Sequence, residues 1–332
     1  MNVEKSIRIN KFDNLKGLVI FCIVLGHMAF LTKFDSISFI HNFVFIFHLA
    51  VFFFVAGYFT KIDENLVIKS IKRILMPYIL FTIVFWIFWL PFGIPSRIIF
   101  IYPTYALWFL LTLFIMKIAL PVINRFKFPL LLSLIFALLF GLVEYTGDVL
   151  ALSRVFAFFP VFLIGFYFKS YKAILEEKYV KLNNLLSNNI FGICISCIVL
   201  VSSVLVAYYL PLDFIMMNAP LEHPYSLNMA LRFLIILLGI GFTLILNRYM
   251  TNRECFLTKW GKNSMVIYVV HIFFIVLFKK FSKGILYQQG EIFALIFTFI
   301  VSLLIVMILS RDIFTEYFNI ITGRFADLIL KD

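Results

Sequence analysis

The sequence predicts an all-α polytopic integral membrane protein with about ten transmembrane helices and with both termini in the cytoplasm. Hydrophobic residues make up 63% of the 332 residues and charged residues 14%, whereas soluble domains have roughly 45–50% apolar and about 25% charged residues. The mean hydropathy is +1.05, so a water-soluble globule of this size could not bury its apolar side chains. The apolar residues form long runs rather than alternating with polar ones, which favours helices over the strands of a β-barrel.

Ten apolar runs are each close to the roughly 20 residues that a membrane-spanning helix needs. The predicted spans are residues 15–34, 39–60, 74–91, 105–124, 128–146, 154–170, 189–211, 228–247, 264–281 and 291–310. After the last span, residues 311–330 alternate polar and apolar side chains, which predicts either an amphipathic helix on the membrane surface or a loop. Since no internal repeat or separate soluble segment is visible, residues 1–332 are predicted to form a single transmembrane domain.

The distribution of the 29 Lys and Arg residues predicts the orientation. Most of them lie on one side, which includes the loops 61–73, 169–188 and 248–263. Cytoplasmic loops collect Lys and Arg, so this side and both termini are predicted to be cytoplasmic, in a multi-pass protein of the cell (plasma) membrane. The cluster from Lys279 to Lys283 is a local exception on the outer side. The same bias explains the net charge of +12, and without a compact basic domain nucleic acid is not an expected partner.

The first span carries ionisable residues along one helix face. Lys16 and His27 are eleven residues apart, almost three helical turns, so they project from the same face about 16 Å apart along the axis. Asp13 lies three residues before Lys16 and is predicted to pair with it. Gly17 and Gly26 leave room for another helix or a ligand. Ionisable groups are costly inside a bilayer, which makes them functional candidates. A single histidine is also commonly a packing residue, and both readings of His27 stay open.

Two further spans carry histidines that are candidates to join His27. His48 lies deep in the second span, and His41, seven residues earlier, is expected to be an interfacial residue closer to the outer surface. In the ninth span Tyr268 and His271 are three residues apart and share a face. The histidines of these three spans are therefore candidates to meet in one cavity. A metal site is not expected, because neither a carboxylate nor a pair of histidines four residues apart accompanies them.

Large polar residues near the outer ends of three spans each have two readings. Arg154, which opens the sixth span, either reaches the lipid headgroups or holds an oxygen-rich or anionic ligand. Arg232, near the start of the eighth span, has the same alternatives. Trp108, near the outer end of the fourth span, is either a residue of the interfacial aromatic belt or a flat platform for a sugar ring.

Six groups of short motifs follow one another along residues 7–275. They are Asp13 to Gly17 with Gly26 and His27; Phe47, His48, Phe52 to Phe54, Gly57 and Tyr58; Arg73, Pro77 and Tyr78; Leu107 to Phe109; Arg154, Phe158 to Pro160 and Gly165; and Gly261 to Ser264 with Tyr268 and His271. The ordered set resembles the membrane acyltransferase-3 family, and within it the sugar O-acetyltransferases of the fucose 4-O-acetylase type.

The resemblance implies ten helices, an acyl-CoA donor and transfer of the acyl group to a carbohydrate hydroxyl. Lys16 and His27 match the basic residue and the histidine of the family's first helix, and with His48 they are the implied catalytic residues. The family's basic pair before the third helix is matched loosely. The expected donor-binding residues are Lys69, Lys72, Arg73 and Asp13. The expected acceptor-binding residues are Arg154, Trp108, His271 and Tyr268.

The expected function is therefore a membrane-bound O-acyltransferase that needs no metal. It moves an acyl group, expected to be acetyl, from cytoplasmic acetyl-CoA to a sugar, glycolipid or exopolysaccharide of the cell envelope. His27 is the expected general base, because a neutral imidazole can take the hydroxyl proton as the acyl carbonyl is attacked. A covalent acyl-histidine intermediate is a less economical alternative.

Two other classes of function stay open. A transporter or flippase for a lipid-linked sugar or polysaccharide would share the spans, the aromatic residues and the buried polar groups. It would also predict an inverted repeat and broken helices at matching positions, neither of which is visible in the sequence. A scaffold for polysaccharide assembly, without catalysis, is the third reading.

Overall fold

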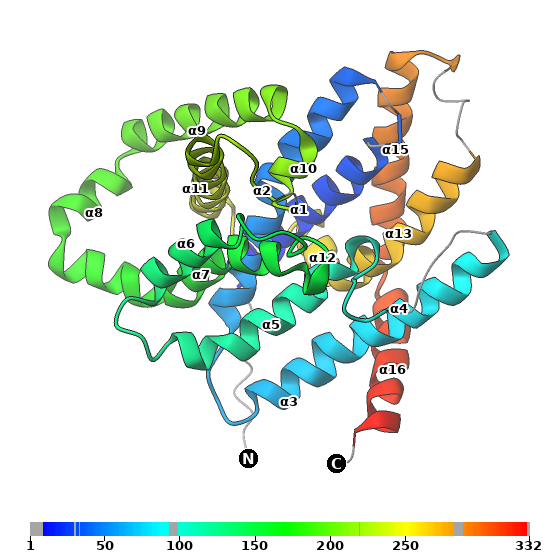
Figure 1. Ribbon diagram of the computed structural model, residues 1–332. Coiled ribbons are helices and arrows are strands. Elements are labelled where there is room, and N and C mark those ends of the chain that lie inside the picture. Colours follow the sequence, from blue (N-terminus) through cyan, green and yellow to red (C-terminus); the bar gives the residue numbers. More distant parts are fainter. Residues whose placement is uncertain are drawn as a thin grey trace.

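The computed structural model describes residues 9–29, 31–32, 34–92, 99–218, 220–281 and 288–330, and these residues form helices, turns and loops without a strand (Figure 1). Eight helical segments within these ranges are long and apolar enough to cross a membrane. They are α1 (Asn10–Ala29), α2 (Asp35–Phe59), the continuous run of α3 (Leu66–Ser70), a π-helical turn (Ile71–Leu75) and α4 (Met76–Trp89), α5 (Trp108–Ile123), α7 (Leu152–Lys178), α9 (Asn189–Tyr209), α11 (Tyr225–Tyr249) and α15 (Glu291–Leu309). The prediction of an all-α polytopic membrane protein is confirmed.

The predicted span at 128–146 is wrong in length. Only α6 (Pro129–Leu139) is helical there, and its 11 residues rise about 16 Å, well short of the roughly 30 Å of a hydrocarbon core. The apolar residues that follow form turns instead, and the carbonyl of Gly141 accepts a hydrogen bond from the backbone amide of Leu221 at 2.7 Å. A hydropathy profile depends on how apolar the residues are and contains no information on where the backbone turns. Residues 140–146 are apolar enough to extend the predicted span although they are not helical.

The predicted span at 264–281 is present as α13 (Ser264–Phe281), but it is one arm of a bent pair. The other arm is α12 (Phe256–Lys262), and the two axes differ by 81°, as in a broken span or a re-entrant loop. With this pair counted as one span, up to nine helices among the described residues satisfy the requirements for a crossing. That number is one fewer than predicted, and α6 accounts for the difference.

Hydrogen bonds join loops that the charge pattern assigns to the same side. Near the start of α1, the side-chain amide of Asn14 donates to the backbone carbonyls of Thr251 and Arg253, both at 2.9 Å. At the other end of the bundle, the backbone amide of Leu150 donates to the carbonyl of Ile101 at 2.7 Å. Each of these bonds joins segments that the charge pattern assigns to one side of the membrane, and the arrangement of the loops in two opposite sets stays a prediction. Which set faces the cytoplasm stays a prediction.

α1 and α2 lie next to each other inside the bundle, where α2 contacts α7 and α11 and α1 contacts α12, α13 and α15 (Figure 1). A reciprocal pair of glycines sets the spacing of α2 and α7. A Cβ atom at Gly57 would overlap the carbonyl oxygen of Phe162, and one at Gly165 would overlap that of Phe54. Small residues allow this close approach of two backbones in a membrane.

A second reciprocal pair joins α1 to α12. A Cβ atom at Gly17 would overlap the carbonyl oxygen of Leu257, and one at Gly261 would overlap that of Asp13. The positions of α1, α2, α7 and α12 are thus fixed by backbone contacts. Because α1 and α2 carry three of the histidines, these contacts also fix where the histidines lie.

Substitution of Gly57 by alanine is expected to destabilise the protein by about 1–3 kcal/mol or more, because the added methyl group forces the α2 and α7 backbones apart. Gly26→Ala is the matched control on the adjacent helix. Its Cβ would lie 3.5 Å from the nearest atom of Val44, an ordinary van der Waals distance. The measurement is thermal unfolding of both purified variants in one detergent. Equal stability of the two variants would contradict the close-packing argument.

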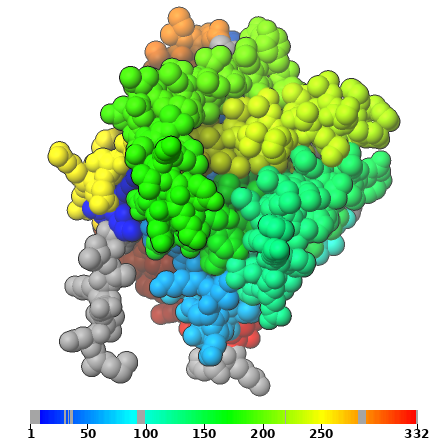
Figure 2. Space-filling view, turned by 90° about the vertical axis from the view of Figure 1, so that its left-hand side faces the viewer, coloured from blue at the N-terminus to red at the C-terminus, as the bar shows by residue number. Residues whose placement is uncertain are grey.

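Two helices outside the main bundle carry little of its core. α8 (Val180–Ser187) has no buried residue and lies on the molecular surface beyond α7 (Figure 2). α16 (Asp312–Ile329) buries Phe318, Thr322 and Ala326 along one face, and the ring of Phe318 stacks on Phe81 of α4 at 5.3 Å between centroids. Of the two alternatives for residues 311–330, the amphipathic helix is confirmed. Its contact with a membrane surface stays a prediction.

Candidate active site

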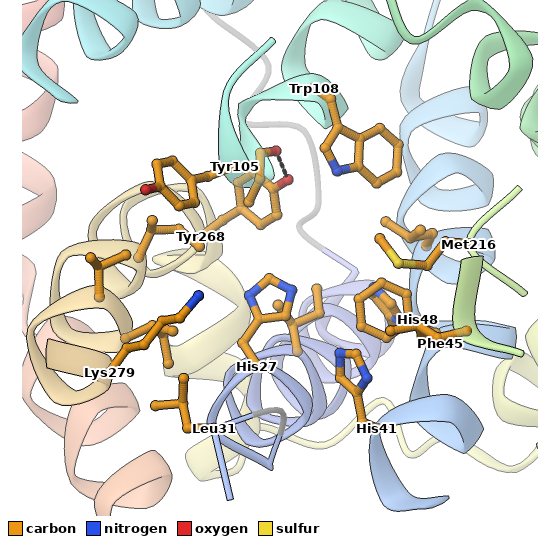
Figure 3. A pocket seen from close by; sticks show the side chains of 17 residues that line it. His27, Leu31, His41, Phe45, His48, Tyr105, Trp108, Met216, Tyr268 and Lys279 are labelled. Atoms are coloured by element: carbon orange, nitrogen blue, oxygen red, sulfur yellow. Dashed lines mark hydrogen bonds between the residues drawn. The ribbon is translucent and has the colours of Figure 1, made fainter. Parts of the chain in front are cut away.

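A cavity of about 280 Å³ lies between α1, α2, α5, α13 and the short helix α10 (Leu212–Ile215). Its walls are mostly apolar. The side chains with polar atoms that line it are His27, His41, His48, Tyr105, Trp108, Tyr268 and Lys279 (Figure 3). An apolar cavity with a few convergent polar groups is the usual form of a ligand site. The helices that supply these groups are distant in the sequence, so the fold is what brings them together.

The imidazoles of His27 and His271 contact each other directly. His27 Nδ1 lies 3.1 Å from His271 Nε2, and His271 Nδ1 lies 2.9 Å from the carbonyl oxygen of Ile267. Because a carbonyl only accepts, a neutral His271 donates its Nδ1–H to Ile267 and keeps the lone pair on Nε2. His27 then donates its own Nδ1–H to that lone pair. This assignment leaves Nε2 of His27 unprotonated and able to accept a proton.

His48 and His41 lie on the α2 wall of the same cavity. His48 Nδ1 donates to the carbonyl of Val44 at 2.8 Å, which leaves its Nε2 as an acceptor in the same way. His41 is buried and lines the cavity, contrary to the expectation of an interfacial residue. The ring of Phe45 lies 5.8 Å from His27 and 4.5 Å from each of His41 and His48, between centroids. Among the described residues, no group of three or more His, Cys, Asp or Glu is arranged to hold a metal ion.

Trp108 and Arg154 form a stacked pair at the edge of the cavity. The guanidinium carbon of Arg154 lies 4.3 Å from the centroid of the Trp108 ring, and Arg154 Nε donates to the carbonyl of Met216 at 3.2 Å. Arg154 is only 7% exposed, so it does not reach out to headgroups. Tyr268 lines the cavity and donates its hydroxyl to the carbonyl of Ala106. Trp108 lines the cavity as well, whereas Arg154 lies behind it.

The surroundings of Arg232 indicate a structural role, because its guanidinium is hydrogen-bonded inside the protein. It is buried, and its Nε donates to the carbonyl of Ala137 at 2.8 Å. Its Nη2 donates to the backbone carbonyl of Ser153 at 3.1 Å and to the Ser153 hydroxyl at 3.0 Å. These bonds tie α11 to α6 and to the start of α7. Arg232 therefore neither reaches headgroups nor lines the cavity.

Two of the expected catalytic and donor-site lysines are paired with local carboxylates. Lys16 Nζ lies 2.9 Å from Asp13, which is the pairing that the spacing predicted. Lys69 Nζ lies 3.1 Å from Asp63. Lys16 does not line the histidine cavity. The shared helix face of Lys16 and His27 thus does not bring both side chains into one pocket.

Arg73 lies between two hollows at the end of the bundle that is predicted to be cytoplasmic. One, of about 240 Å³, is lined by the cations Lys61, Lys69, Arg73 and Lys117 together with Asp63. The other, of about 540 Å³, is lined by Lys72, Arg73 and residues of α16. Arg73 and Lys72 belong to the π-helical turn, a distortion that frequently marks functional sites. The first hollow gathers more positive than negative side chains, which suits an anionic ligand.

Several residues of these sites are not among the residues predicted from the sequence, and they include Phe45, Tyr105, Lys117 and Lys279. Phe45 lies four residues after His41 and three before His48, so the helical period alone could have placed it among the histidines. Lys117 is a single basic residue near the end of the fourth predicted span, with no motif around it. Lys279 was noticed only as an exception to the charge bias. For Lys117 and Lys279, no pattern in the sequence indicates toward which site the side-chain amine points.

The chain was also compared with known proteins. Over residues 9–311 it matches a family model described as an acyltransferase domain, the acyltransferase-3 model. No significant match is found among curated proteins or among solved structures. The family match covers most of the chain and includes every histidine of the cavity.

Proposed function

This chain belongs to the acyltransferase-3 family of membrane acyltransferases, and from that premise we propose that it transfers an acetyl group from cytoplasmic acetyl-CoA to a hydroxyl of a cell-envelope carbohydrate. The acceptor is a sugar, glycolipid or exopolysaccharide, as for enzymes of the fucose 4-O-acetylase type. The observation that carries the proposal is the histidine pair: His27 lies in an apolar cavity with its Nδ1 3.1 Å from His271 Nε2, a contact that leaves Nε2 of a neutral His27 as the acceptor. That arrangement is a base held by a second group, as acyl transfer requires.

His27 is the proposed general base. As the acceptor oxygen attacks the thioester carbonyl, its proton passes to His27 Nε2 and a tetrahedral intermediate forms. Collapse of the intermediate breaks the carbon–sulfur bond, and the leaving coenzyme A sulfur takes the proton back from His27 Nε2, which restores the neutral base. The bond from His27 Nδ1 to His271 fixes the orientation of the ring. His48, with its own unprotonated Nε2, is the alternative base.

The donor is proposed to bind at the cationic hollow beside the π-helical turn. Coenzyme A carries phosphates, and Arg73 with Lys69 and Lys117 supplies positive groups around one hollow. Lys72 extends the positive surface toward α16. Lys16 and Asp13 form an ion pair at the same end of α1 and are proposed to shape this entrance. The acyl-bearing arm of the donor would extend from here into the bundle.

The acceptor is proposed to bind in the histidine cavity. Trp108 offers a ring face to a sugar, and the Arg154 guanidinium on that ring fixes its position. Tyr268, whose hydroxyl is held by Ala106, forms the adjacent wall. His271 contributes through His27, because its own nitrogens are occupied by His27 and Ile267.

Sealed membrane vesicles of defined orientation test the proposed function. Acetyl-CoA labelled in the acetyl group is supplied outside the vesicles, and label in the glycan fraction is counted. Vesicles with the cytoplasmic face outward are expected to transfer label, and right-side-out vesicles are expected not to. A transporter or a scaffold would transfer none in either orientation. Transfer only in right-side-out vesicles would reverse the predicted topology while keeping the reaction.

A further inference from the structure

Lys279 breaks the charge pattern of the chain and also lines the histidine cavity. It lies near the end of α13 on the side predicted to be outside the cell, where lysines are rare. It follows His271 by eight residues, about 12 Å along the helix axis. Its side chain points back toward His27 (Figure 3). A lysine that only anchored the helix would direct its amine outward to the headgroups.

Among the residues that the structure describes, those that line this cavity do not balance its charge. Lys279 is the ammonium group among them, and no Asp or Glu of the described residues lines the cavity. No salt bridge to Lys279 is present in the described part of the chain. The neighbouring Lys280 does not line the cavity. An exposed cation thus stands at the edge of an apolar site, beside the proposed base.

We infer that the acceptor carries an anionic group that pairs with Lys279 while the hydroxyl to be acylated lies at His27 Nε2. This inference rests on the proposed function and specifies its substrate class: an acidic sugar or a phosphorylated one. An ammonium is a strong partner for a carboxylate or phosphate oxygen, especially next to apolar walls that exclude water. The pairing would select the acceptor and orient the hydroxyl toward the base. Lys279 would act in acceptor recognition and take no part in proton transfer.

The test compares Lys279→Gln with Lys280→Gln, an adjacent lysine on the same helix. The full-length protein transfers labelled acetyl to three preparations of the host's envelope glycan: untreated, with carboxylates reduced to alcohols, and with phosphates removed. For untreated glycan, Lys279→Gln is expected to raise the apparent KM about ten-fold or more. The KM for acetyl-CoA should stay unchanged, and Lys280→Gln should behave as wild type. Lys279→Arg keeps the charge and should recover most of the loss, which separates charge from folding.

The two treated glycan preparations identify the recognised anion. Combined with the Lys279→Gln variant, they also give the equivalent of a double-mutant cycle. Removing the recognised anion from the glycan should cost the wild-type protein about as much as the Lys279→Gln change, with no further loss when the two are combined. Loss after carboxyl reduction indicates an acidic sugar, and loss after phosphate removal indicates a phosphate. Equal use of all three glycans by the wild type, or equal behaviour of the two Gln variants, would overturn the inference and leave the acyltransferase intact. Absence of transfer to any glycan by the wild type would instead refute the proposed function itself.

Discussion

Replacement of His27 by alanine is expected to lower turnover by about 10²–10⁴-fold, the usual contribution of a general base. Acetyl-CoA binding should persist, since His27 does not line the cationic hollow beside Arg73. The measurement is the transfer of labelled acetyl by purified variants, together with equilibrium binding of acetyl-CoA. Wild-type activity should also fall on acidification, because a protonated imidazole cannot accept the hydroxyl proton.

Variants of the other histidines distinguish the base from the residues that orient it. His271→Gln keeps an acceptor near the position of Nε2 and should retain more turnover than His271→Leu, which leaves the Nδ1–H of His27 without its partner. Neither variant should change the KM for acetyl-CoA. A folded His27→Ala protein with more than about a tenth of wild-type turnover would refute the assignment, because a general base is worth more than that. His48→Ala would then be the next variant to measure.

Removal of two cations from the cationic hollow, the proposed donor site, is expected to have the second-largest effect. Arg73→Ala and Lys117→Ala should each raise the KM for acetyl-CoA about ten-fold, and together by roughly a hundred-fold, if each makes one charge-assisted hydrogen bond to a phosphate. Turnover at saturating donor should change much less, because this binding energy is common to the ground and transition states.

Arg125→Ala is the matched control for the two variants of the cationic hollow. Arg125 is exposed just after α5, on the same predicted side, and does not line the hollow. Its substitution lowers the net charge by the same amount but should leave the KM for acetyl-CoA unchanged. An equal rise in all three single variants would mean that only the general positive potential matters. No rise in any of them would show that the donor binds elsewhere.

Much of the fold and part of the candidate site could be predicted because helical geometry is regular. The apolar runs located most of the crossing helices, and the spacing of Tyr268 and His271 placed them on one face of α13. The depth of His27 and His48 in their spans then made a common cavity reasonable. The pair of Lys16 and Asp13 followed from their spacing and is present at 2.9 Å.

The remainder depended on tertiary contacts that no local pattern encodes. The shortness of α6 depends on turns after Leu139, where Gly141 accepts a backbone hydrogen bond from Leu221. His41 was expected at the interface, but the packing of α10 on α2 encloses the cavity around it. The contact of His27 with His271 joins residues 244 positions apart. Periodicity can place each histidine on its own helix face, but it cannot place the two faces against each other.

The reciprocal glycines between α1 and α12 bear on how the acceptor range of such a protein could evolve. They hold the helix of His27 against the bent arm that leads into the helix of His271, so the alignment of the two rings depends on backbone contacts. Other parts of the cavity wall, Tyr105, Leu212 and Met216, come from short helical turns and loops at one end of the bundle. Such segments tolerate substitution far better than close-packed helices. If the acceptor binds in this cavity as proposed, new acceptor preferences can arise by changing that wall, while the geometry of the His27–His271 pair is inherited unchanged.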